Sequence, residues 1–460
     1  MKKLYILFLT VFFLGSCDLL EMDDDMNNSP NSPSDASAQQ LMTSAMRSLP
    51  GISSNTGAQF LGQYLAETQY VVASRYPAGG TSFYGWYQSP LINLETVLTS
   101  EFNTATSDNQ LAVTKILKAY FFWHVTDRWG DVPYSEALKG GDNITPAYDT
   151  QESIYDDLFA LLEEADGQID ESGSISGDIV YGGDMAKWKN FGNTVRLLMA
   201  LRLSEVNASK ASAEFNAALT AGVMESNDDS FVYQHLADAD NQNYWYGQVV
   251  ESSRNWWALT ETLVDIMDPV DDPRLAVYGE ETETSGGYIG LPIGSDASNQ
   301  NVTDFSLLGE DIHQQDSPVY LVTYAQALFA QAEAAELGWT TEDAGTNYNA
   351  AIEASIDQWT GSTADAAAFL AQPDIVYDGT VEQIATQRYV HLFMNGYEGW
   401  AEWRRTGFPA FVPSDGNEVP TRQSYTADES FNNTANYEAA IDRQFGGDND
   451  LYGQVWWDVN

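Results

Sequence analysis

The sequence predicts a mostly α-helical fold: a stack of helical hairpins of tetratricopeptide-like length, carrying a long loop-rich layer and few short strands. Apolar residues recur at helical spacing through most of the chain after residue 35, and strand-like alternation is rare. Long stretches rich in Gly, Pro and aromatic residues separate the helical segments, while no clean linker or exact repeat divides the chain. We therefore expect a single domain over residues 36–460.

The helical segments have Leu, Ile, Val and aromatic residues three or four positions apart, as in Ile154, Leu158 and Leu161 behind a Thr150 cap. This pattern predicts helices over 36–49, 86–102, 111–129, 151–166, 185–205, 211–221, 256–267, 318–337, 347–359, 381–393 and 397–405. The clearest strand is 230–233, and the main irregular stretches are 70–90, 127–148, 225–256, 268–318 and 406–460. Loops of this length are usually functional or form a second layer of structure.

Residues 1–16 have the form of a signal peptide, with Lys2 and Lys3, a short apolar run and small residues before Cys17. The segment 14–17, Leu-Gly-Ser-Cys, resembles the bacterial lipobox, in which the Cys thiol takes a diacylglycerol. We therefore expect Cys17 to be lipidated and to anchor the chain in a membrane. The alternative is an ordinary signal peptide with an incidental cysteine near the cut.

Residues 17–35 are predicted to form the lipidated Cys and a flexible tether, because an acidic run is followed by Ser, Asn and Pro. The acidic run also resembles the surface-export signal of Bacteroidetes lipoproteins, which implies the outer face of the outer membrane. The alternative is that these acids only solvate the tether.

The composition excludes several classes of partner and chemistry. Because 67 acidic residues oppose 20 basic ones, for a net charge of −47, the chain repels phosphate backbones and is expected to bind no nucleic acid. Cys17 is the only cysteine, so disulfides and thiolate metal sites are not expected. The four histidines are scattered and no nucleotide-loop or esterase motif is present, so we predict no metal, no cofactor and no catalytic residue, although incidental calcium at acidic loops stays open.

Three segments carry a family resemblance: 117–138, containing Thr-Asp-Arg-Trp-Gly-Asp; 318–339, containing Thr-Tyr-Ala-Gln; and 384–409, containing Gly-Tyr-Glu-Gly-Trp-Ala-Glu-Trp-Arg-Arg. With the lipobox and the closing Trp456-Trp457-Asp458, they resemble the SusD/RagB family, in particular its starch-binding-associated branch. Gln326 departs from the Glu that the family commonly has there. The residues themselves indicate structural roles: Asp127 and Asp131 are expected to cap or pair locally, and Arg404 and Arg405 to pair with buried acids.

The resemblance implies a lipid-anchored protein on the extracellular face of the outer membrane. Members of the family capture a glycan and act as a lid on a SusC-like TonB-dependent transporter, and they are not enzymes. The partners it implies are therefore an oligo- or polysaccharide, that transporter, and the membrane through the anchor.

A sugar site needs flat aromatic faces for the C–H side of the ring and polar groups for its hydroxyls. The densest such stretch is 241–257, where amides flank Tyr244, Trp245 and Tyr246, and an Arg-Asn pair precedes Trp256 and Trp257. Because three consecutive aromatics cannot all face one core, at least one should be exposed. The remaining glycan-binding candidates are Arg75, Tyr76, Tyr84, Trp86 and Tyr288. The alternative for all of them is packing in a small core.

Two other functions stay open. A helical-repeat scaffold that binds only protein partners would fit the helix stack. A glycoside hydrolase would need two carboxylates at a defined separation, and Glu398, Glu402, Asp127 and Asp131 attract attention only because they lie in the motifs.

Overall fold

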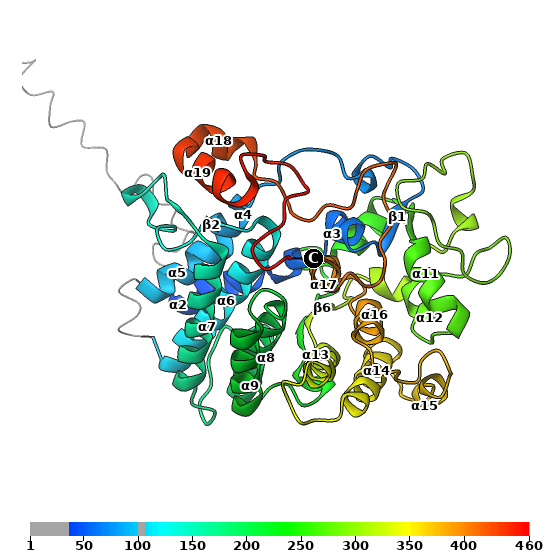
Figure 1. Cartoon of the computed structure of the whole chain (residues 1–460), viewed down its shortest axis with the longest axis horizontal. Coiled ribbons are helices and arrows are strands. Elements are labelled where there is room, and N and C mark those ends of the chain that lie inside the picture. The colour runs from blue at the N-terminus through cyan, green and yellow to red at the C-terminus, as the bar shows by residue number, and fades with distance from the viewer. Residues whose placement is uncertain (1–35, 100–105, 460) are drawn as a thin grey trace, which may run out of the picture.

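The structure is a computed structural model that describes residues 36–99 and 106–459 (Figure 1). The predicted signal peptide, Cys17 and the tether lie outside the described residues. The described part forms a stack of antiparallel helices along one side of the molecule, with the loop-rich segments lying across it (Figure 1). This confirms the predicted mostly helical class.

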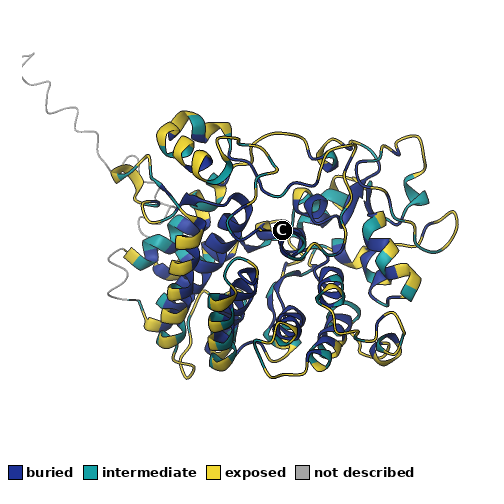
Figure 2. Ribbon diagram, in the orientation of Figure 1, coloured by how far each residue is buried: buried dark blue, intermediate teal, exposed yellow. Residues whose placement is uncertain are grey.

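Three helical hairpins make up the stack. Helix α6 (Asp108–Trp129) packs on α7 (Gln151–Gln168), α8 (Met185–Arg202) on α9 (Ala208–Ala221), and α13 (Tyr324–Glu336) on α14 (Ala344–Thr360). Helix α16 (Val381–His391) packs on α13, and α17 (Gly396–Thr406) on α16; at the other end α2 (Ala38–Met46) packs on α5 (Ile92–Thr99). Figure 2 shows that these helices turn buried faces to one another and exposed faces outward.

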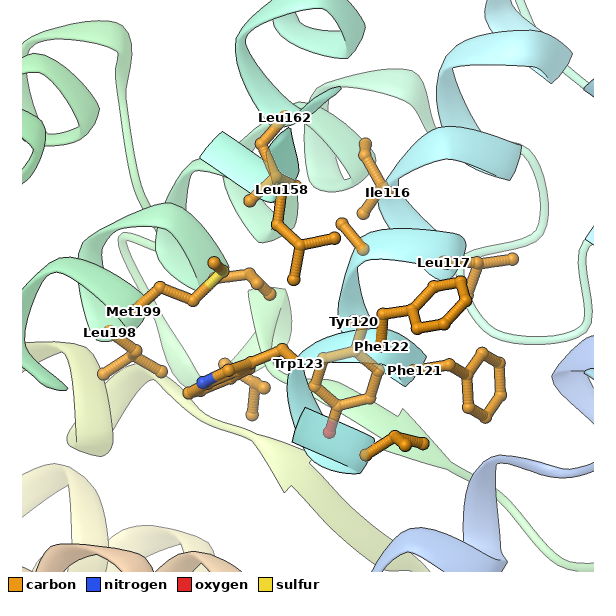
Figure 3. Close-up of a cluster of buried hydrophobic side chains, with 14 of the residues drawn as sticks. Ile116, Leu117, Tyr120, Phe121, Phe122, Trp123, Leu158, Leu162, Leu198 and Met199 are labelled. Atoms are coloured by element: carbon orange, nitrogen blue, oxygen red, sulfur yellow. The ribbon is translucent and has the colours of Figure 1, made fainter. Parts of the chain in front are cut away.

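Local sequence explains where these helices begin and end. The side chain of Ser107 accepts from the N–H of Gln110 at the start of α6, and Thr150 does the same for Ser153 at the start of α7. Gly361 and Gly407 end α14 and α17 in the left-handed conformation that glycine adopts without strain. Between α6, α7 and α8 the apolar faces form a continuous core (Figure 3), with these buried side chains: Ile116, Leu117, Tyr120, Phe121, Phe122, Trp123, Leu158, Leu162, Leu198 and Met199.

The described strands form three short antiparallel pairs. Strand β1 (Leu65–Glu67) pairs with β5 (Trp257–Leu259), β2 (Val132–Pro133) with β3 (Tyr148–Asp149), and β4 (Phe231–Tyr233) with β6 (Val319–Val322). The shorter helical elements are η2 (Leu49–Ile52), α3 (Thr56–Leu61), η3 (Ala73–Arg75), α4 (Tyr84–Trp86), η4 (Tyr87–Leu91), η6 (Gly140–Asp142), η7 (Asn227–Asp229), α10 (Tyr244–Tyr246), η8 (Gly247–Glu251), α11 (Glu261–Met267), η9 (Asp268–Val270), α12 (Leu275–Tyr278), η10 (Val302–Asp304), η11 (Glu310–His313), α15 (Ala366–Leu370), α18 (Ala427–Asn432) and α19 (Thr434–Phe445).

Some predicted boundaries are wrong. The helix expected from residue 256 begins only at Glu261, because Trp257–Leu259 pairs with β1 and Thr260 caps α11. The helix expected from residue 318 begins at Tyr324, because Val319–Val322 pairs with β4. The segment after residue 406 was expected to be irregular but contains α18 and α19. In the first two cases, pairing with a distant strand decides where the helix begins, and the apolar periodicity of a segment carries no information about that pairing.

A buried network of charges joins the helices at the centre of the stack. The carboxylate of Glu402 on α17 accepts from three arginines: Arg202 of α8 at 2.5 Å, Arg388 of α16 at 2.7 Å, and Arg405 of its own helix at 2.7 Å. Burial opposes ionisation of Glu402, but the three guanidinium groups outweigh it and hold its pKa below the usual range. Pairing of Arg405 with buried acids is thereby confirmed, whereas Arg404 donates to the backbone carbonyls of Asp127 and Thr421.

The network extends to α6 and α13. Arg202 also reaches Glu398 at 2.7 Å and Asp127 at 3.2 Å, while Glu333 binds both Arg388 and Arg405. The Gln326 amide donates to Glu398 over 3.0 Å. Gln326 is thus a neutral donor at a position where the Glu common in the family would add a further carboxylate to the network. The Asp127 carboxylate thus contacts Arg202, Tyr155 and Trp457, all distant in sequence. The expectation that Asp127 caps or pairs locally is wrong.

The network generates a stability prediction. Glu402→Gln removes the charge shared by three buried arginines, and we expect it to lower the free energy of unfolding by about 3–5 kcal/mol, measured by urea denaturation. The matched control is Glu163→Gln, whose 71% exposed carboxylate pairs with Arg196 at 3.5 Å. The Glu163→Gln substitution should lower the free energy of unfolding by less than about 1 kcal/mol. Equal, small effects of both substitutions would contradict a structural role for the network.

Candidate functional site

Two aromatic rings, one exposed and one half-buried, lie in contact on the loop layer. The pairing of β1 with β5 sets Glu67 opposite Trp257, and just beyond it the N–H of Thr68 donates to the carbonyl of Trp256 over 2.9 Å. Two residues further on, the Tyr70 ring lies 5.1 Å from the Trp256 ring at an interplanar angle of 58°. Tyr70 is 71% exposed, whereas Trp256 is half-buried. Two chain segments far apart in sequence thus build one aromatic surface.

The backbone at this pair is strained. Tyr70 has a φ of 64° and Ser253, which precedes the Trp256 segment, has a φ of 52°. Both lie in the left-handed region that residues with a side chain adopt at a cost of about 1–3 kcal/mol. Such strain persists only where the surrounding structure imposes it, and here it holds an aromatic side chain out in water.

Arg254 adds hydrogen-bond donors to the rings. Its guanidinium lies 6.0 Å from the Trp256 ring and donates to the side-chain oxygen of Gln248 over 2.9 Å. Among the ion pairs of the described residues, Arg254 has none, although the chain carries a large excess of acids. We call Tyr70, Arg254 and Trp256 the platform. It offers two ring faces and an exposed fork of N–H donors.

Several predicted site residues are buried. Trp245 is 1% exposed and packs edge-on against Trp257 at 5.4 Å, and Tyr76 donates to the carbonyl of Phe60 in the core. The expectation that Trp245 presents its ring at the surface is therefore wrong. The single turn of α10 points three aromatic residues in different directions, and the middle one points inward. Tyr244 and Tyr246 on either side of it are half-buried.

The other predicted residues are dispersed. Arg75 is held by Asp415 at 3.1 Å and by the carbonyl of Gly294 at 2.8 Å. Trp86 packs against Phe121 of α6 at 5.8 Å. Tyr288 packs against the apolar cluster beneath the platform and is half-buried. Of the predicted candidates, only Trp256 therefore belongs to the platform.

Tyr84 lies in a groove far from the platform: its helix α4 sits beside α18 and α19, at the opposite end of the loop layer from β1 (Figure 1). The groove has a volume of about 530 Å³ and is lined mainly by Tyr87, Leu138, Asn143 and Ile144, with Glu429 at one side. Both Tyr84 and Tyr148 donate their hydroxyls to the Glu429 carboxylate, which is thereby satisfied.

The sequence analysis missed Tyr70. It opens the irregular stretch 70–90 as a single tyrosine before two valines, outside the clusters of tryptophans and amides that indicate a sugar site. A usable signal was an aromatic residue placed where a strand-like segment gives way to a Gly- and Pro-rich stretch. Its partner Trp256 lies 186 positions away, so no local pattern joins the two.

The carboxylates of the motifs are unsuited to catalysis. Glu398, Glu402 and Asp127 are buried and bound to arginines, and Asp131 accepts from the first N–H of α7 and from Arg443. Asp131 therefore caps α7, but its ion pair with Arg443 joins distant parts of the chain and is not local as expected. Burial lowers the pKa of both His124 and His391 to about 3. Within the described ranges no group of three or more His, Cys, Asp or Glu is arranged to hold a metal ion.

The described residues define a protein of the helical-repeat class, with an aromatic surface on the loops that cross the helix stack. The particular family follows from the sequence: the chain belongs to the SusD-like family described as starch-binding and associating with the outer membrane, whose model matches residues 30–426. No helix within residues 36–99 or 106–459 has the length and hydropathy to cross a bilayer.

Solved structures of this family share the fold. A chitin-binding protein is 31% identical with a TM-score of 0.82, covering 92% of this chain and 100% of its own. A SusD homologue from Bacteroides fragilis is 27% identical with a TM-score of 0.82, covering 92% and 99%. A chitin-binding SusD homologue from Flavobacterium johnsoniae is 25% identical with a TM-score of 0.79, covering 92% and 98%. No curated protein matches the chain in sequence.

Glu67, at the base of the platform, gives a pH prediction. Burial raises its pKa to about 7, partly offset by a hydrogen bond from the Ser74 backbone. Because this folded-state pKa lies above the ordinary 4.5, the stability contribution of Glu67 is fully present below about pH 4.5 and is lost as the pH rises through 7.

We therefore expect Glu67→Gln to stabilise the protein at pH 8 by on the order of 2 kcal/mol and to change little at pH 4.5. Urea denaturation of both proteins across this pH range measures the difference. A difference that does not depend on pH would show that Glu67 does not titrate in this window.

Proposed function

We propose that this protein binds a neutral oligo- or polysaccharide on the platform, non-covalently and without cutting it. The observation that carries the proposal is the contact between the exposed Tyr70 ring and the half-buried Trp256 ring, with Arg254 beside it. Ring faces cover the C–H side of a sugar, and the guanidinium donates to hydroxyl, ring or acyl oxygens. Relatives named as chitin-binding proteins support the same ligand class.

The charge of the chain narrows the ligand class. A net charge of −47 repels polyanions, and the platform contributes one arginine against this field. A neutral glycan is indifferent to the field, and an acetamido carbonyl would give Arg254 a strong acceptor. N-acetylhexosamine oligosaccharides are therefore the first ligands to test, followed by starch fragments.

The glycan would then pass to a partner transporter. The association of the family with the outer membrane supports a location at that membrane. The lipobox at residues 14–17 would anchor the chain there through Cys17. Delivery to a SusC-like TonB-dependent transporter is part of the proposal. An anchor with a flexible tether would keep the platform near the channel at high effective concentration, which compensates for modest affinity.

The platform is tested by two substitutions. Tyr70→Ala and Trp256→Ala should each weaken binding of chitin oligosaccharides by about 1–3 kcal/mol, or roughly 5- to 150-fold, in isothermal titration calorimetry. The control is Tyr452→Ala, which removes an exposed tyrosine of the C-terminal segment and should leave affinity unchanged. Absence of binding to any neutral glycan would favour the scaffold alternative, and release of reducing ends would favour an enzyme.

Anchoring is tested separately. Cys17→Ser removes the acceptor thiol, so the protein should move from the membrane fraction to a soluble fraction and lose incorporation of labelled fatty acid. Ser16→Ala keeps the cysteine and a small residue before it, and should still be anchored. A Cys17→Ser protein that remains in the membrane fraction would contradict lipidation at this residue.

A further inference from the structure

A second cavity, which we call the inner cavity, lies where the loop layer meets the helix stack. Its volume is about 160 Å³. The walls come from four elements and one turn: Trp245 of α10, Val277 of α12, Tyr320 of β6, Gln358 and Trp359 of α14, and Phe393 beyond α16. None of the platform residues lines it.

Polar atoms of the wall lack partners. The side-chain nitrogen and oxygen of Gln358 are both shielded from solvent and have no hydrogen-bond partner among the described residues, and the same holds for the indole N–H of the almost fully buried Trp245. Two other side chains of the wall do have partners: Trp359 donates to the carbonyl of His391, and the Asn243 amide donates to that of Ser317. Buried polar groups in proteins are almost always paired, so these atoms point to a ligand.

The unpaired atoms define what this ligand must offer. It needs an acceptor for the indole N–H and for the amide NH₂ of Gln358, and a donor for the amide oxygen. Hydroxyl groups supply both. No basic side chain lines the inner cavity, and the one carboxylate, Asp311, disfavours an anion. The ligand is therefore a neutral polyol.

Size and wall chemistry restrict it further. A cavity of ~150 Å³ is large enough for one benzene-sized ring. Trp359, Tyr320 and Phe393 provide aromatic surface on which C–H groups can pack. Water has no such groups, so it would not use this surface. One six-membered sugar ring fits these demands, and a longer stretch of chain does not.

We propose that the inner cavity binds a single neutral pyranose, the end unit of a glycan or a free monosaccharide, through the Gln358 amide and the Trp245 indole N–H. The choice of a sugar rests on the proposed function, but the site is distinct from the platform. The two are connected through a chain of rings, with centroid distances of 5.4 Å from Trp245 to Trp257, 5.4 Å from Trp257 to Trp256, and 5.1 Å from Trp256 to Tyr70.

The test titrates glucose and N-acetylglucosamine into the mature protein and its variants, followed by ligand-observed NMR. Gln358→Leu should weaken monosaccharide binding by about tenfold or more, because it removes two hydrogen bonds and keeps the volume. Val277→Phe, which fills the inner cavity, should abolish monosaccharide binding. Tyr70→Ala should leave it within about twofold, since Tyr70 belongs to the platform and does not line the inner cavity.

A crystal soaked with the monosaccharide supplies an independent readout. Sugar density between Gln358 and Trp359 supports the proposal. Ordered water alone in the inner cavity, or unchanged monosaccharide binding by both Gln358→Leu and Val277→Phe, overturns it. Failure of the platform variants to affect oligosaccharide binding would instead count against the proposed function, so the two outcomes are distinguishable.

Discussion

The Glu402 carboxylate, shared by Arg202, Arg388 and Arg405, is the interaction on which the rest of the structure depends. Through these arginines it joins α8, α16 and α17, and Glu333 adds α13. A buried charge of this kind is stable only when every partner is present, because an unpaired guanidinium in the core costs several kcal/mol. The network therefore specifies how the helical hairpins meet. It also explains why the segments that carry the family resemblance have so many charged residues.

The proposed glycan platform is separate from this network. The platform lies beside the β1–β5 pair, and its rings come from the segment that follows β1 and the segment that precedes β5, at the same end of the pair. The motif residues of α17 lie inside the molecule and provide no surface for a ligand. Because the platform lies on loops and the charged network lies between helices, changes in the loops can alter the surface and leave the helix contacts untouched.

Sequence reasoning predicted the helices well because apolar periodicity and caps are local. It also predicted that Arg405 pairs with buried acids, since a charged residue in an aromatic helix needs a partner. It failed where long-range contacts decide the outcome. Trp245 was expected at the surface, but its burial depends on packing against Trp257 and the helix stack. Tyr70 was missed because its partner Trp256 joins it only through the pairing of β1 with β5.

The central claim is that the platform is where a neutral glycan binds, and a crystal structure with a chitin or starch oligosaccharide tests it most directly. We expect a sugar ring stacked on Tyr70 or Trp256, with an acceptor oxygen of the glycan within hydrogen-bond distance of Arg254. An oligosaccharide bound in the groove beside Tyr84 and Glu429, with the platform left in contact with solvent, would contradict it.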